Sequence, residues 1–204
     1  MLRSDIERNI GRFQSRRLED EGLRHAAVSL VILESSQGHG NHSLLLTLRT
    51  AKLKQHSGQY ALPGGKVDAG ETALEAARRE VHEELGFELA MDDCLGVLDD
   101  YGTRSGFCMT PYVFWAKANT QILPSPDEVE EVYKIPFAEL NSEAIPIFEG
   151  GVDPDRPVLL SEFPTLGHQM FSPTASIIYQ FREVVIRGED TRVSHFDQPA
   201  FAWK

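Results

Sequence analysis

Residues Gly65–Phe87 read GKVDAGETALEAARREVHEELGF, and the fold prediction starts from this stretch. Pro63, Gly64 and Gly65 stand at its beginning and predict a tight turn. Good helix formers then run without interruption from about Glu71 to Leu85, and Gly86 follows as a helix C-cap. The stretch therefore predicts a glycine turn that leads directly into one helix.

Three glutamates share one stripe of this predicted helix. Glu80, Glu83 and Glu84 are spaced i, i+3, i+4, so their side chains are neighbours. Such like-charge pairs cost about 0.2–0.5 kcal/mol each, and the macrodipole disfavours anions near a helix C-terminus. A solvated acidic face is one interpretation. The other is a site for a hard cation, since Mg²⁺ and Mn²⁺ bind carboxylate oxygens together with substrate phosphates.

The whole stretch resembles the Nudix box: glycine, five residues, glutamate, seven residues, then Arg-Glu-apolar-any-Glu-Glu-any-Gly-apolar. The positions that match this pattern are Gly65, Glu71, Arg79, Glu80, Val81, Glu83, Glu84, Gly86 and Phe87. Every specified position matches. The resemblance implies an α/β fold, an α/β/α sandwich around a mixed β-sheet. It also implies a pyrophosphohydrolase that cleaves a nucleoside diphosphate linked to another group.

The resemblance also assigns roles to individual residues. It implies one to three Mg²⁺ or Mn²⁺ ions, held by catalytic side chains and one backbone carbonyl. These ligands are Glu80, Glu83, Glu84 and the carbonyl of Gly64. Glu80 is further expected to orient or deprotonate the attacking water. Glu71 and Arg79 are expected to support the loop against the helix, the alternative being an ordinary surface ion pair.

A second motif precedes the box in Leu45–Gly65, LLTLRTAKLKQHSGQYALPGG. It resembles the signature of the coenzyme A diphosphatase branch of the same family, Leu-Leu-Thr-any-Arg-Ser/Ala, three residues, Arg, three residues, Gly, three residues, Phe-Pro-Gly-Gly. The matching positions are Leu45, Leu46, Thr47, Arg49, Gly58, Pro63, Gly64 and Gly65. Thr50, Lys54 and Leu62 depart from it. Lysine keeps the charge at position 54 but loses the bidentate grip of arginine on a phosphate.

Basic residues gather just before the box in an otherwise acidic chain. Arg49, Lys52, Lys54 and His56 form this basic island, which is suited to the phosphates of a nucleotide. The predicted substrate-binding residues are Arg49, Lys54, Gly64 and Gly65. The alternative for the island is an exposed, lysine-rich loop.

A further catalytic glutamate is implied by the resemblance in the acidic loop PSPDEVEE, residues 124–131. Glu128, Glu130 and Glu131 are the candidates, and the alternative is an exposed loop. Tyr112, Phe114 and Trp115 lie in a predicted strand, where aromatic residues are common. Core packing is therefore the preferred interpretation for them, with stacking on a base as the alternative.

The remaining pattern predicts a single domain over residues 1–204. An N-terminal helix over about 4–17 falls within residues 1–22, and the core spans 24–187. The predicted strands are 24–34, 44–49, 94–101, 107–117, 132–135, 145–148 and 157–163, with helices at 137–140 and 172–186. Ser172 is the predicted N-cap of the last helix. The apolar tail 188–204 is expected to dock on its own domain or on a dimer partner, and His39 and His42 to be exposed in a loop.

The composition is that of a globular protein, with 41% hydrophobic and 25% charged residues among 204. No apolar run approaches the about 18 residues of a membrane span, and no signal-peptide core is present, so a cytoplasmic protein without membrane contact is expected. The net charge of −11 argues against nucleic-acid binding. Cys94 and Cys108 have no metal-site spacing and are expected to be buried thiols.

Together these features predict metal-dependent hydrolysis of a small-molecule nucleotide. The first substrate candidate is coenzyme A or a derivative, cleaved to phosphopantetheine and adenosine 3′,5′-bisphosphate. The alternative enzyme is a pyrophosphatase acting on ADP-ribose, a dinucleotide or a nucleoside triphosphate. A third hypothesis is a nucleotide sensor without catalysis, and the intact box argues against it.

Overall fold

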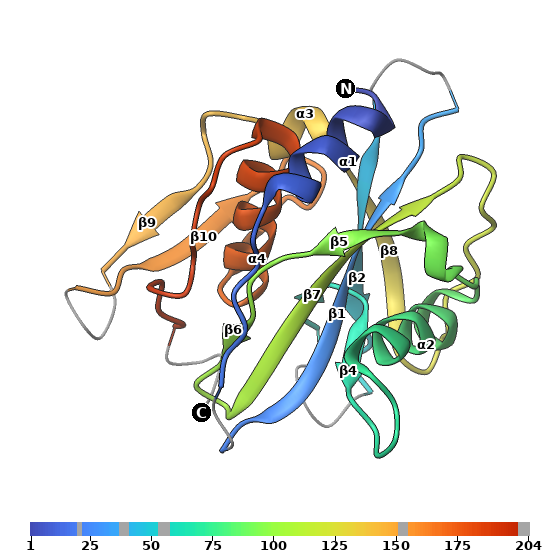
Figure 1. Ribbon diagram of the computed structural model, residues 1–204, viewed down its shortest axis with the longest axis horizontal. Coiled ribbons are helices and arrows are strands. Elements are labelled where there is room, and N and C mark those ends of the chain that lie inside the picture. Colours follow the sequence, from blue (N-terminus) through green and yellow to red (C-terminus); the bar gives the residue numbers. More distant parts are fainter. Residues whose placement is uncertain (20–21, 37–40, 53–57, 151–154, 200–204) are drawn as a thin grey trace.

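The computed structural model describes residues 1–19, 22–36, 41–52, 58–150 and 155–199, and it has three layers (Figure 1). A large mixed sheet lies between helix α2 (Ala73–Leu85) on one face and helices α1 (Arg3–Arg12) and α4 (Thr174–Phe181) on the other. The predicted α/β fold around a mixed sheet is confirmed. Within the described residues, no helix is long and apolar enough to cross a membrane.

The large sheet is built around two long parallel strands. These are β1 (Arg24–Leu33) and β7 (Phe107–Ala116), which pair along their whole length. The antiparallel neighbours are β2 (Ser43–Arg49) and β4 (Gly64–Lys66) on β1, β3 (Tyr60–Ala61) and β8 (Val129–Pro136) on β2, and β5 (Cys94–Val97) and β6 (Tyr101–Gly102) on β7. A short 3₁₀ turn, Met91–Asp93, precedes β5.

Strand β1 shows why this sheet is covered on both faces. Its Val28, Leu30 and Ile32 belong to the core under α1 and α4. Ala27 and Val31, one residue out of phase, belong to the core under α2. Because successive side chains of a strand point to opposite faces, a central strand buried on both must be apolar throughout. This accounts for the nearly unbroken apolar run from residue 26 to residue 33.

Helix α2 is capped at both ends by local sequence. The Thr72 hydroxyl accepts a hydrogen bond from the Glu75 backbone N–H at 3.2 Å, and the Glu75 carboxylate accepts one from the Thr72 N–H at 2.7 Å. This capping box starts the helix at Ala73, two residues later than predicted. Gly86 ends it in the left-handed conformation with φ of 72°, which confirms the predicted C-cap.

Gly86 is expected to tolerate no side chain. An added β-carbon would lie 2.5 Å from the Leu123 carbonyl oxygen, in addition to the cost of positive φ. We expect Gly86→Ala to lower the free energy of unfolding by about 2–3 kcal/mol, measured by urea denaturation. Gly106→Ala is the control, because Gly106 also has positive φ, 82°, but no atom of the described residues lies within 4 Å of an added β-carbon. Equal losses in both variants would contradict the predicted clash with the chain at Leu123.

A smaller sheet and the last helix complete the fold. The sheet consists of β9 (Ile147–Glu149), β10 (Val158–Glu162) and β11 (Gln169–Phe171), and the short helix α3 (Phe137–Leu140) precedes it. Helix α4 continues as a π-helical turn over Arg182–Arg187. The prediction of Ser172 as its N-cap is wrong. The Ser172 hydroxyl donates to the Leu159 carbonyl at 3.0 Å instead, and Pro173 occupies the cap.

The N-terminal helix is shorter than predicted and ends at Arg12. The chain beyond it is bound by two buried carboxylates. Asp99 accepts the Arg16 N–H at 2.7 Å, and Asp100 accepts the Leu18 N–H at 3.0 Å. These aspartates lie between β5 and β6, so the single strand predicted over residues 94–101 is interrupted where it binds this segment.

Other sequence predictions differ in detail. Strand β8 starts at Val129 rather than at residue 132, because its pairing with β2 continues as far as Arg49. His42 is buried rather than exposed, since its ring packs 4.7 Å from that of Trp115, and burial lowers its pKa. His39 lies outside the described residues. The thiols of Cys94 and Cys108 are half-buried and buried, respectively.

The C-terminal segment packs on the same chain up to the last described residues. Val193 and Phe196 are buried in the core under α1 and α4. Asp197 is 1% exposed and accepts two hydrogen bonds from the Arg104 guanidinium at 2.5 and 2.7 Å. Phe201 and Trp203, which also contributed to the predicted docking, lie outside the described residues.

Candidate active site

The glycine turn and the box helix are in direct contact. Strand β4 pairs with Ala26–Val28 of β1, which places Gly65 against the side of α2. A β-carbon on Gly65 would overlap the carboxylate of Glu80 and lie 2.8 Å from its Oε2. The Glu80 carboxylate therefore occupies the space that only glycine leaves open. This explains in physical terms why the motif starts with glycine.

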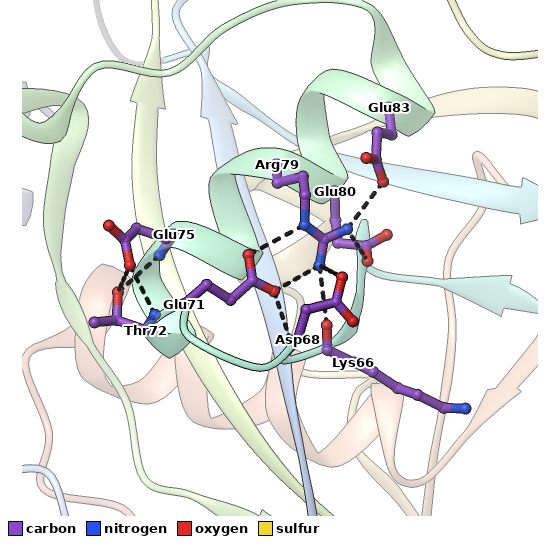
Figure 2. A network of polar contacts seen from close by, with 8 residues as sticks. All are labelled: Lys66, Asp68, Glu71, Thr72, Glu75, Arg79, Glu80 and Glu83. Atoms are coloured by element: carbon purple, nitrogen blue, oxygen red, sulfur yellow. Dashed lines mark hydrogen bonds and ion pairs between the residues drawn. The ribbon is translucent and has the colours of Figure 1, made fainter.

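Arg79 connects the loop before α2 with the glutamates on the helix (Figure 2). Its guanidinium donates to Glu71 at 2.8 and 3.2 Å and to the Lys66 carbonyl at 3.0 Å. It also donates to Glu80 at 2.8 Å and to Glu83 at 2.9 Å. One planar fork thus fixes the loop and two glutamates at once. This geometry agrees with a supporting role rather than with an isolated surface ion pair.

A lysine cannot reproduce this arrangement, because its ammonium is a single point of donation on a flexible chain. We expect Arg79→Lys to lower any turnover at this site by about tenfold through misplaced carboxylates, while the chain stays folded. Steady-state kinetics checks this, with Arg78→Lys as the control on the same helix, since Arg78 instead donates to the Leu89 carbonyl at 2.7 Å. Equal losses in both variants would contradict a specific role for Arg79.

Glu84 is the most buried of the three glutamates, with a relative exposure of 1%. Its Oε1 lies 3.3 Å from the Arg49 guanidinium, and its Oε2 is buried and has no hydrogen-bond partner among the described residues. Burial raises the pKa of Glu84 to about 8, although the neighbouring Arg49 charge lowers it. A carboxylate in this position is costly to the fold unless a cation or a proton reaches it.

The residues present fit a hard divalent cation. Glu80 and Glu84 offer only oxygen donors, the Glu84 Oε2 lacks a partner, and burial raises the pKa of Glu80 as well. Glu83 is further out, with a side chain 48% exposed and bonded to Arg79. In the described part of the chain, no three acidic, histidine or cysteine side chains converge as a preformed metal site. Arg79 and Arg49 instead neutralise these carboxylates in this arrangement.

The structure distinguishes between the glutamates of the loop before β8. Glu128 is close enough that its charge raises the pKa of both Glu80 and Glu84. Its loop is attached to the end of α2, where the Ser125 N–H donates to the Glu84 carbonyl at 2.9 Å. Glu130 and Glu131 are exposed on β8, and Glu131 accepts the Tyr133 hydroxyl. Of the three candidates, Glu128 lies at the site.

A cavity of about 780 Å³ opens beside the glycine turn. Gly64, Gly65 and Lys66 line it on one side, together with Arg49 from β2. Among the described residues that line it, none is aspartate or glutamate, although the chain has 31 of these and a net charge of −11. The cavity therefore suits an anionic ligand in an otherwise acidic protein. Lys54 and His56 of the basic island lie outside the described residues.

The aromatic lining of the cavity was not predicted from the sequence. It consists of Tyr60, Phe107, Tyr133 and Phe171. These residues come from four separate strands, β3, β7 and β8 of the large sheet and β11 of the small one, so only the tertiary fold brings them together. Phe114 and Trp115 are buried in the core, as the preferred interpretation had it, and Tyr112 packs at the core under α2.

Comparison with known proteins agrees with this geometry. The family model described as the NUDIX domain matches residues 23–158, which include the glycine turn, α2 and β8. This chain belongs to the Nudix family. The match ends within β10, so α4, β11 and the C-terminal segment lie beyond it.

Individual Nudix relatives support the assignment. A protein of Pectobacterium atrosepticum named "Uncharacterized Nudix hydrolase NudL" is 39% identical over 117 residues, 57% of this chain and 59% of that protein. The chain thus matches about three fifths of that relative's length. The protein of the same name from Citrobacter koseri is 36% identical over 135 residues, 64% of this chain and 68% of that one. A MutT/nudix family structure from Enterococcus faecalis shares the fold, with TM-score 0.54, 15% identity, and coverage of 91% and 75%.

Proposed function

We propose that this protein hydrolyses the diphosphate of a nucleoside diphosphate linked to a second group. One observation carries the proposal. Glu80 lies against Gly65, and Gly64 and Gly65 line a cavity whose described lining includes no acidic residue. On the same helix, Glu84 is buried with an oxygen that has no hydrogen-bond partner among the described residues. Carboxylates that are costly to the fold and placed beside an anion-compatible cavity are typical of a catalytic cation site.

The residues divide the work according to their position. Glu80, Glu83, Glu84 and the Gly64 carbonyl would hold Mg²⁺ or Mn²⁺. Glu128, whose charge acts on both Glu80 and Glu84, would add a further negative charge. When bound, such ions neutralise the diphosphate and lower the pKa of water. Arg49 lines the cavity and would bind a phosphate oxygen. Glu80 orients or deprotonates the attacking water, while Glu71 and Arg79 hold the loop in place.

For the substrate we propose coenzyme A or a derivative, cleaved to phosphopantetheine and adenosine 3′,5′-bisphosphate. The resemblance of the motif before the box supports this choice, and so does the cavity. Its volume of about 780 Å³ lies in the upper part of the range of about 300–1,000 Å³ that ligand sites span. That is room for both halves of a large nucleotide conjugate.

Product analysis after incubation with Mg²⁺ tests this proposal, with coenzyme A and ADP-ribose in parallel reactions and Mn²⁺ as a second metal. We expect phosphopantetheine from coenzyme A, formed faster than ADP-ribose is cleaved, and no reaction in EDTA. Cleavage of ADP-ribose alone would overturn the substrate and keep the reaction. Binding of either nucleotide without hydrolysis, with both metals tried, would overturn the reaction and favour a sensor.

A further inference from the structure

We infer that the C-terminal segment beyond the family match selects the second group of the substrate, and that this group is an extended, uncharged and largely apolar chain. The inference rests on the proposed function, because it concerns the group that is joined to the nucleoside diphosphate and separated from it by hydrolysis. Its basis is the composition of the cavity. One part of the lining, called here the C-terminal wall, consists of residues 166 and 168–174 and Gln198, none of which falls within residues 23–158.

The cavity has a tyrosine end, defined by Tyr60 and Tyr133. Their rings lie edge to face with centroids 5.5 Å apart, next to Arg49 in the lining. The Tyr60 hydroxyl donates to the Leu166 carbonyl at 3.3 Å, which connects the C-terminal wall to this end. Both rings are half-buried, and His168 adds a hydrogen-bonding group nearby. Flat aromatic faces with polar edges are suited to a nucleotide base.

The other end, the methionine end, is defined by Met109 and Met170 with Phe107 and Phe171. Strand β7 supplies the first member of each pair, and the C-terminal wall supplies the second. Methionine side chains are unbranched and adapt to irregular apolar ligands. Hydroxyl and amide groups lie among them, namely Ser105, Thr174 and Gln198. Such a lining provides hydrophobic contact along a chain and hydrogen bonds for a few amide groups.

The methionine end is held together by contacts between β6 and the C-terminal segment. Tyr101 pairs with Met109 across the sheet, and its hydroxyl donates to the Phe196 carbonyl at 3.1 Å. The ion pair of Arg104 with buried Asp197 fixes the neighbouring Gln198, whose amide donates to the Gly102 carbonyl at 3.4 Å. The wall is therefore a fixed part of the cavity, and its shape imposes selectivity on whatever group enters.

The diphosphate position lies between the two ends. Gly64–Lys66 pairs with Ala26–Val28 of β1, so the glycine turn and the cavity floor share the same stretch of sheet. A nucleoside diphosphate with its base at the tyrosine end would direct its second group toward the methionine end. The Arg24 guanidinium lies over the Phe107 ring at 3.9 Å but is not part of the described lining, in which the methionine end has no charged side chain. A second ribose phosphate or nucleotide would therefore find no charged partner within that lining.

Two substrates that differ only in the second group test this inference. Dephospho-coenzyme A is ADP joined to pantetheine, and ADP-ribose is ADP joined to ribose. We expect Thr174→Trp to reduce the ratio of kcat/KM for dephospho-coenzyme A to that for ADP-ribose by about tenfold or more, because the added ring fills the methionine end. Ser105→Trp fills the same end from the β6–β7 turn and provides an independent second variant.

Tyr133→Ala removes an aromatic ring from the tyrosine end and tests the opposite expectation. It should lower kcat/KM for both substrates by about tenfold and leave their ratio within about threefold, since both carry the same base. Glu189→Trp is the matched control for bulk, because Glu189 is exposed and does not line the cavity. It should leave the ratio unchanged.

The outcomes separate the two proposals. A lower ratio in both tryptophan variants supports the inference. An unchanged ratio, or a ratio changed instead by Tyr133→Ala, overturns the assignment of the ends. Wild-type cleavage of ADP-ribose without cleavage of dephospho-coenzyme A overturns the apolar chain alone and leaves the hydrolase intact. Failure of the wild type to cleave any nucleoside diphosphate conjugate overturns the proposed function itself.

Discussion

Glu84→Gln should lower turnover by about a thousandfold or more and at the same time stabilise the metal-free protein at neutral pH. The two effects have opposite signs because the Glu84 carboxylate is buried at 1% exposure, and one of its oxygens has no hydrogen-bond partner in the described part of the chain. Its charge disfavours the fold and is required only when a cation is bound. A neutral amide of nearly the same shape removes this cost but is a poor ligand for a hard cation.

The raised pKa of Glu84 determines whether its contribution to stability rises or falls with pH. Burial raises the Glu84 pKa from 4.5 to about 8 in the folded protein. Between these values the folded state holds a proton that the unfolded state has lost, so the contribution of Glu84 to stability is complete below about pH 4.5 and declines as the pH rises. Above about pH 8 both states are ionised and the decline stops. At pH 7 we expect Glu84→Gln to gain on the order of 1–3 kcal/mol.

Urea unfolding in EDTA at pH 5, 7 and 9, together with steady-state kinetics in Mg²⁺, measures both effects. Glu83→Gln is the matched control, because the Glu83 side chain is 48% exposed and its loss should reduce turnover without a gain in stability. A Glu84→Gln protein that is less stable than wild type at pH 7 and fully active would show that Glu84 serves the fold through Arg49 instead.

The box helix was predictable because its determinants are local. Its N-terminal loop, its C-cap at Gly86 and the common stripe of Glu80, Glu83 and Glu84 all follow from spacing along a helix. Which of the three glutamates is buried does not follow from spacing. That depends on Arg49 of β2 and on the loop through Ser125, both distant in sequence. The choice of Glu128 over Glu130 has the same origin, since strand pairing positions it.

The motif before the box shows that a residue can match a sequence pattern without lying at the site. Leu45, Leu46 and Thr47 match its pattern, yet all three are fully buried in β2 and none lines the cavity. Part of that resemblance therefore reflects how the strand packs. The matching residues that line the cavity are Arg49 and the glycines. The aromatic and methionine lining had no sequence signal at all, because these residues, which come from two different sheets, meet only in the folded chain.

Gly65→Ala is expected to abolish most of the activity while the chain still folds. An added β-carbon would overlap the Glu80 carboxylate, which is the far end of a flexible side chain and can move away. The fold therefore accommodates the change, but Glu80 leaves the position in which it faces the glycine turn and the Arg79 fork. A displaced ligand of this kind is expected to reduce turnover by about a hundredfold and to weaken Mn²⁺ binding.

Gly64→Ala provides the contrast, because the neighbours of its added β-carbon are backbone. It would overlap the Ala27 carbonyl oxygen and lie 2.8 Å from the Val28 Cα, both in the central strand β1. The pairing of β4 with β1 would have to open, so this variant should lose stability first, by about 2–4 kcal/mol. Thermal unfolding and Mn²⁺ titration of both variants distinguish the two effects. A Gly65→Ala protein with wild-type Mn²⁺ affinity and turnover would contradict this prediction. The β-carbon would then displace Glu80 without any effect on metal binding or catalysis, so the position of Glu80 beside Gly65 would have no part in the reaction.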